Sequence, residues 1–248
     1  AGLVSVLWPI ATLYSFEYMS TEEREQPFFM FYTMTYGVTL GIAFSANIVS
    51  MYFFYEMLTL VTIPLVLHTF TREAVLATRK YIYFSIGGAA LGFMGLVFLV
   101  RYGGPGGFTL GGILQGHTAG LGLDLVLLLY VVAFLGFSIK AAMFPFYSWL
   151  PDAGVAPTPV TALLHAVAVV KAGAFAVIRL TYYCFGTELL RGTWAQNVVM
   201  ALAMFTVVFG CSMGVKETHM KRRLAFSTVS NLSYIIFGAT IMTPAGLL

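Results

Sequence analysis

Long apolar runs, separated by short polar connections, divide the chain into segments of membrane-spanning length. A helix needs about 20 apolar residues to cross a bilayer, whereas the strands of a membrane barrel alternate over about ten. The eight apolar segments are 1–16, 28–46, 47–67, 79–101, 124–147, 159–183, 194–214 and 224–243. This pattern predicts an all-α, polytopic transmembrane helix bundle of about eight spans, with a very tight turn at 45–47 between the second and third.

The composition agrees with a membrane protein. Of the 248 residues, 59% are hydrophobic and 9% are charged, while soluble proteins are about a quarter charged. The net charge of +3 requires no nucleic acid, and Cys184 and Cys211 are too isolated to indicate a disulfide framework or a metal cluster. Residues 1–248 therefore form a single transmembrane domain. Because the chain begins inside an apolar stretch without Met or a basic region, we expect a partial span at 1–16, within a fragment of a longer subunit, and not a signal peptide.

The connections differ in charge and in glycine content. If 17–27, 68–80, 148–158 and 215–223 share one side, that side holds eight basic residues: Arg24, Arg72, Arg79, Lys80, Lys216, Lys221, Arg222 and Arg223. The other side holds only Arg101, Arg179 and Arg191, so the first side is predicted to be cytoplasmic. Residues 103–122 contain nine glycines, but no predicted strand precedes them and no GKS or GKT follows, which favours a loop over a phosphate-binding turn.

The run from 124 to 147 contains a lysine and then a proline. Lys140 at the depth of a bilayer costs about 2.5–3.5 kcal/mol on insertion scales, so a functional reason for its presence is expected. Pro145, five residues later, removes a backbone donor and predicts a discontinuous helix broken near that position. An irregular backbone within a membrane requires protein or water around it.

The stretch from 144 to 159, FPFYSWLPDAGVAPTP, continues the break. Its prolines, among them Pro151, exclude one continuous helix. The pattern predicts a half-helix, an interfacial turn anchored by Trp149, and a new helix from Thr158 with Pro159 in its first turn. Asp152 is assigned a structural role in closing the turn, with a place in a proton entry path as the alternative.

Three ionisable residues lie deep in apolar runs on three different spans: Glu56, Lys140 and Lys171. One reading is a fixed ion pair that sets helix register, although a buried pair contributes little net stability. The second lysine has no matching acid, and burial favours the neutral form of an unpaired amine. We therefore predict that the three residues transfer protons. Glu56 would hold the ammonium form of Lys140, and Lys171 would accept the proton when Glu56 moves away.

His165 precedes Lys171 by six residues, which places the two about 120° apart around a helix. It is predicted to relay protons through water, and a hydrogen-bonded structural histidine is the alternative. The remaining histidines, His68, His117 and His219, lie near predicted span ends, and the four are too scattered to indicate a metal site.

Residues 140–180, KAAMFPFYSWLPDAGVAPTPVTALLHAVAVVKAGAFAVIRL, resemble the core of the antiporter-like, proton-translocating subunits of respiratory complex I. Mrp cation/proton antiporters and membrane-bound hydrogenases share this subunit type. FFYEMLTL at 53–60 and KRRLAFSTVSNLSYI at 221–235 are similar to two further motifs of the family. The resemblance implies two inverted five-helix repeats, of which residues 28–183 form the first and 194–243 begin the second; the second broken helix would lie after Leu248.

The resemblance also implies roles for single residues. Glu56 matches the glutamate of the family's fifth helix, Lys140 the lysine of its broken seventh helix, and Lys171 the lysine of its eighth. His165 matches a histidine present in some members.

The expected function is proton translocation by an antiporter-like subunit of a multisubunit complex that is redox-driven or exchanges cations for protons. A structural scaffold with non-transporting ion pairs is one alternative, and Na⁺/H⁺ exchange within an Mrp assembly is another, disfavoured because few deep carboxylates are present for Na⁺. No cofactor is expected in this chain, since nicotinamide, flavin and iron–sulfur clusters would belong to partner subunits of an NADH:quinone oxidoreductase-like or hydrogenase-like enzyme. The expected partners are further membrane subunits, and the expected location is a bacterial or archaeal cytoplasmic membrane or an organellar inner membrane.

Overall fold

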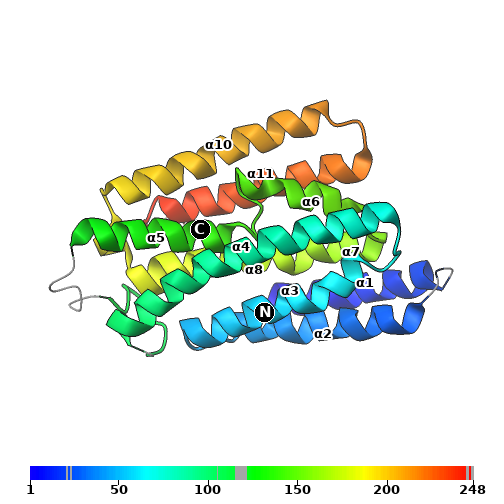
Figure 1. The fold of residues 1–248 in the computed structure, drawn as a ribbon, viewed down its shortest axis with the longest axis horizontal. Coiled ribbons are helices and arrows are strands. Elements are labelled where there is room, and N and C mark those ends of the chain that lie inside the picture. Colours follow the sequence, from blue (N-terminus) through cyan, green and yellow to red (C-terminus); the bar gives the residue numbers. More distant parts are fainter. Residues whose placement is uncertain (21, 23, 105, 115–121, 244–245, 247–248) are drawn as a thin grey trace.

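The chain folds into a bundle of long, roughly parallel helices (Figure 1). The structure, a computed structural model, describes residues 1–20, 22, 24–104, 106–114, 122–243 and 246. Its long helices are α1 (Gly2–Met19), α2 (Glu25–Ala43), α3 (Ile48–Val66), α4 (Arg72–Gly103), α5 (Leu123–Ser138), α8 (Val169–Arg179), α10 (Trp194–Lys216) and α11 (Met220–Thr240). Each predicted segment contains one of them, and the described residues include no strand, so the all-α transmembrane bundle is confirmed.

Four helical stretches among the described residues are long and apolar enough to cross a membrane. They are Ile48–Val66, Arg72–Gly103, Thr158–Phe185 and Trp194–Lys216, and the shorter helix Leu123–Ser138 is also apolar. The count of eight spans stays a prediction.

Helix α8 occupies the centre of the bundle (Figure 1). It is preceded by α7 (Thr158–Ala162) and the π-turn η3 (Leu163–Val167), and is followed by the π-turn η4 (Leu180–Phe185) and the short α9 (Thr187–Leu190). It contacts α2, α3, α5 and α11. Helices α7 and α8 and the two π-turns together form the candidate span Thr158–Phe185. Its most apolar window is 72% buried inside the protein, against 28–39% for the other three candidate spans. This stretch is therefore more enclosed by protein than the other three candidate spans.

Glycines bring neighbouring helices close together, because the absence of a side chain lets two backbones approach each other. A Cβ atom on Gly136 of α5 would lie 2.4 Å from the backbone nitrogen of Gly92 on α4, and one on Gly88 would lie 2.9 Å from the carbonyl oxygen of Gly136. A Cβ on Gly210 of α10 would lie 3.0 Å from a backbone nitrogen of α11, whereas one on Gly37 would meet nothing within 4 Å. Backbone contact thus fixes the α4–α5 and α10–α11 pairs.

The tight turn predicted at 45–47 connects α2 to α3. Asn47 begins α3 as its N-cap, since its side chain accepts a hydrogen bond of 2.8 Å from the backbone nitrogen of Ser50. At the right-hand end of Figure 1, the C-terminus of α1 lies on the same side as the N-termini of α4 and α11. Three of the basic connections thus share one end of the bundle, as the charge count requires.

Candidate functional site

The helix that leads to Lys140 ends before it. Helix α5 stops at Ser138, seven residues before Pro145, near which the break is predicted. Residues 139–145 form turns, in which Ala142 has a left-handed φ of 56° and the Phe144–Pro145 peptide is cis. The predicted discontinuity is confirmed, and it includes Lys140 itself.

Short helices follow the break: η1 (Phe146–Ser148), α6 (Trp149–Asp152) and η2 (Ala153–Val155). Trp149 is 1% exposed and its ring centroid lies 5.0 Å from that of Tyr81, so it lies inside the bundle and does not anchor an interface. Its indole nitrogen donates a 2.9 Å hydrogen bond to the carbonyl of Ile139. The carbonyls at a helix end lack partners within the helix, so this bond stabilises the end of α5. Pro151 is buried in α6.

Lys140 and Glu56 lie together, as predicted. The ammonium nitrogen of Lys140 is 3.6 Å from Oε1 of Glu56, and the two side chains are 2% and 26% exposed. Their separation is longer than a hydrogen bond, so charge attraction rather than hydrogen bonding connects them.

Tyr55 holds the same ammonium group from two directions. Lys140 donates a hydrogen bond to the backbone carbonyl of Tyr55, and its Nζ lies 3.4 Å from the centre of the Tyr55 ring. The Tyr55 hydroxyl donates a 2.8 Å hydrogen bond to the carbonyl of Phe137 in α5. Sequence reasoning missed Tyr55, and its position next to Glu56 was the only available signal.

Lys171 is half-buried on α8, and among the described residues its side chain forms no hydrogen bond or ion pair. Gly173, two residues further, contacts the Lys140 segment: its Cβ would lie 2.5 Å from the nitrogen of Ala141. Side chains two residues apart on a helix point about 200° apart. Helix α8 therefore touches the Lys140 backbone with the face opposite to Lys171.

His165 is 7% exposed in the π-turn η3, close to the backbone of Leu150. Its Nε2 has no hydrogen-bond partner in the described part of the chain, and neither has the buried hydroxyl of Thr59. An unpaired buried nitrogen at a π-turn is a candidate position for proton transfer through water. His117 lies outside the described residues.

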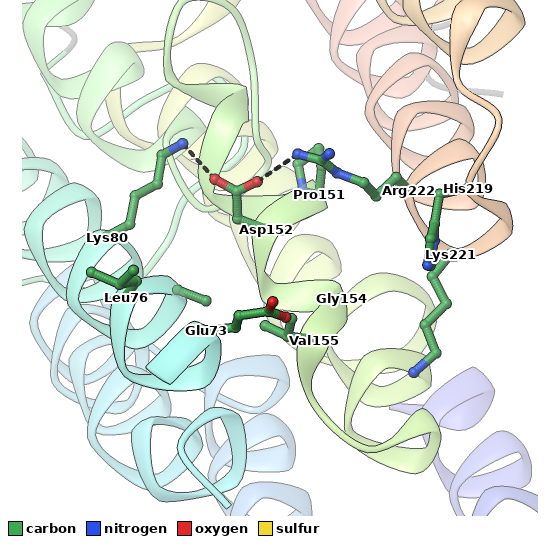
Figure 2. Close-up of a pocket in the computed structure, with 11 residues that line it drawn as sticks. Glu73, Leu76, Lys80, Pro151, Asp152, Gly154, Val155, His219, Lys221 and Arg222 are labelled. Atoms are coloured by element: carbon green, nitrogen blue, oxygen red, sulfur yellow. Dashed lines mark hydrogen bonds and ion pairs between the residues drawn. The ribbon is translucent and has the colours of Figure 1, made fainter. Parts of the chain in front are cut away.

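Asp152 forms two ion pairs at the end of the bundle where the basic connections gather (Figure 2). Its carboxylate lies 2.6 Å from Nζ of Lys80 and 3.0 Å from a guanidinium nitrogen of Arg222. A cavity of about 700 Å³ opens beside the cluster, with Glu73 and Lys221 also in its wall. The charge pattern of the sequence indicates only a topological role for Lys80 and Arg222. Where the structure describes the chain, no three His, Cys, Asp or Glu side chains gather as a metal site requires.

Comparisons with known proteins identify the family of this chain. A family model described as NADH:quinone oxidoreductase/Mrp antiporter, TM, matches residues 45–247. One Na(+)/H(+) antiporter subunit of Bacillus subtilis is 33% identical over 232 residues, which cover 92% of this chain and 28% of the relative. NAD(P)H-quinone oxidoreductase subunit 5, chloroplastic, of Lemna minor is 29% identical over 242 residues, covering 94% of this chain and 31% of the relative. The chain thus spans less than a third of either relative.

Two solved structures share the fold. The Mrp complex from Dietzia sp. matches 87% of this chain and 23% of its own chain, with a TM-score of 0.77 and 26% identity. The membrane-bound sulfane sulfur reductase, an archaeal respiratory membrane complex, matches 96% of this chain and 47% of its own, with a TM-score of 0.80 and 23% identity. The second likeness concerns the fold alone.

Proposed function

Because this chain belongs to the NADH:quinone oxidoreductase/Mrp antiporter transmembrane family, we propose that it moves protons as part of an antiporter-like membrane subunit. The observation that carries the proposal is the Lys140 ammonium, 2% exposed and 3.6 Å from the Glu56 carboxylate. A charge buried so deeply is costly, and such residues mark ion and proton pathways in membrane proteins.

The proton-transfer step follows from the partners of Lys140. Glu56 is the only charged group in contact with the ammonium among the described residues, while the Tyr55 ring and carbonyl are neutral. Movement of Glu56 away from Lys140 would remove the attraction that favours the charged amine, and the buried amine would then release its proton.

The acceptor in this proposal is Lys171, with His165 as a relay. Helix α8 carries Lys171 and touches the Lys140 backbone through Gly173, so the two amines belong to adjoining elements. Since the side chain of Lys171 does not face Lys140, water must bridge the gap. The unpartnered Nε2 of His165 supplies a group that water could reach.

We also propose the complex and the membrane in which this chain works. The relatives are named as subunits, and this chain spans less than a third of each, so the remainder of the subunit would complete the path across the membrane. Partner subunits would supply any electron donor and redox cofactor, and this chain would bind none. The membrane would be a bacterial or archaeal cytoplasmic membrane.

A second candidate function is Na⁺/H⁺ exchange. It is favoured by the likeness to the Bacillus subtilis protein named as a Na(+)/H(+) antiporter subunit. Against direct Na⁺ binding, the site offers one carboxylate, Glu56, while a hard cation prefers several oxygen ligands. A transport assay with and without Na⁺ separates the two functions, because exchange requires Na⁺ and proton transfer alone does not.

The test is Lys140→Ala in the full-length subunit, assembled in its complex and reconstituted into vesicles with a pH-sensitive dye. We expect proton transport to fall at least about tenfold, equivalent to about 1.4 kcal/mol. Lys216→Ala is the control, since Lys216 is exposed at the end of α10. Wild-type transport by the Lys140 variant would remove the proposal. Wild-type transport by Glu56→Gln with Lys140→Met would favour a structural scaffold instead.

A further inference from the structure

We propose that Asp152 is a positioning residue for Lys140: its ion pairs with α4 and α11 fix the short helix α6, and α6 fixes the backbone that carries the lysine. The inference rests on the proposed function, because it assumes that the position of Lys140 governs transport. Two successive contacts, each observed separately, connect Asp152 to Lys140.

The first contact is a clamp, formed by the ion pairs of Asp152 with two helices that are distant in sequence. Lys80 of α4 and Arg222 of α11 bind different oxygens of the same carboxylate, at 2.6 and 3.0 Å (Figure 2). Lys221, next to Arg222, donates a 3.2 Å hydrogen bond to the carbonyl of Ala156. Three cations from α4 and α11 therefore hold residues 152–156 from two sides.

The second contact leads from the clamp to the lysine. Helix α6 is a single turn that begins at Trp149 and ends at Asp152, so a displacement of Asp152 also moves Trp149. The Trp149 indole donates its 2.9 Å hydrogen bond to the carbonyl of Ile139, the residue immediately before Lys140. Because Trp149 is 1% exposed, its ring has little room to absorb the movement by rotating.

Stability alone explains the clamp poorly. The side chains of Lys80, Asp152 and Arg222 are 35%, 31% and 49% exposed, and ion pairs with this access to water contribute little to folding. The cavity of about 700 Å³ beside them admits water, and Glu73, His219 and Lys221 face the same space. The two ion pairs of Asp152 are weak but fix its position, which is what orienting α6 requires. Their removal should leave the bundle folded.

The experiment measures the transport rate and its pH profile for Asp152→Asn in the full-length subunit of the assembled complex. We expect the rate to fall about ten- to a hundredfold, since a small displacement of a reacting group has effects of this size. We also expect the pH of half-maximal transport to shift, because the distance between Lys140 and Glu56 changes. Asp152→Glu, which keeps the charge, should restore most of the rate. Asp124→Asn, at an exposed carboxylate on α5, should leave both readouts unchanged.

Two results would overturn the inference: a wild-type rate for Asp152→Asn, or a reduced rate with an unchanged pH midpoint, which would indicate a structural loss only. If Asp152→Asn fails to assemble, Lys80→Gln combined with Arg222→Gln breaks both ion pairs and keeps the carboxylate, and the same criteria apply. Lys140→Ala in the same assay separates the two proposals. Normal transport by that variant refutes the proposed function, whereas loss in Lys140→Ala together with normal transport in Asp152→Asn refutes only the positioning role.

Discussion

Gly173→Ala tests whether α8 must touch the Lys140 segment. The added Cβ would lie 2.5 Å from the nitrogen of Ala141, 2.9 Å from the carbonyl carbon of Lys140 and 3.1 Å from Cα of Ala141. All three are backbone atoms, so no side-chain rotation relieves the overlap. Helix α8 or the broken segment must move by several tenths of an ångström.

The size of the effect follows from two opposing contributions. Forcing an extra methyl group into a packed interior costs about 1–3 kcal/mol, while alanine is favoured over glycine inside a helix by about 1 kcal/mol. The net expectation is a destabilisation of up to about 2 kcal/mol. The matched control is Gly87→Ala, in the interior of α4, where a Cβ meets nothing within 4 Å. That substitution should stabilise the protein by up to about 1 kcal/mol.

The assay compares thermal unfolding midpoints of the full-length subunit in detergent, followed by transport in vesicles. The expected order of midpoints is Gly87→Ala above wild type and wild type above Gly173→Ala. Transport should fall only in Gly173→Ala, because only that residue contacts the Lys140 backbone. Equal unfolding midpoints and equal transport rates for Gly173→Ala and Gly87→Ala would refute the requirement for this contact.

Two further substitutions test local contacts. Trp149→Phe removes one of the two donors to the buried carbonyl of Ile139, which also accepts from the backbone nitrogen of Ala142, and should cost about 0.5–1.5 kcal/mol. Trp194→Phe, at a ring 42% exposed, should cost less, and equal losses in thermal unfolding would contradict this. Asn47→Ala removes the acceptor for the Ser50 backbone nitrogen and should lower stability by about 1 kcal/mol. Asn47→Asp keeps an acceptor and should unfold at the wild-type temperature. An equal loss of stability in both variants would show that the cap hydrogen bond is not the cause.

Much of the architecture could be predicted because membrane helices are specified by local sequence. Uninterrupted apolar runs allow few alternatives inside a bilayer, where every backbone group must be hydrogen-bonded within the segment. The proximity of Glu56 and Lys140 could be anticipated for a similar reason, since opposite charges inside a membrane protein usually pair with one another. Lys171 shows the limit of that reasoning: its depth in the sequence was visible, but the direction of its side chain relative to Lys140 was not.

The contacts that organise the break depend on distant residues and could not be predicted. Asp152 lies 72 residues from Lys80 and 70 from Arg222 in the sequence, and charge counting assigned both cations to membrane orientation. Trp149 illustrates the same difficulty, because a tryptophan near a turn is typical of a membrane interface. Its burial follows from the carbonyl at the end of α5, which only the folded chain brings within reach.

The two partners in the central pair are held very differently, and this difference determines which one can move. Lys140 is fixed by a carbonyl and an aromatic ring of Tyr55, and its backbone is confined by Trp149 on one side and Gly173 on the other. Glu56 is 26% exposed, and its Oε1 has no hydrogen-bond partner among the described residues. A carboxylate held by charge alone can leave at little cost in broken hydrogen bonds. If the pair opens during transport, the glutamate is therefore the side chain that swings away, while the lysine keeps its place and loses its proton.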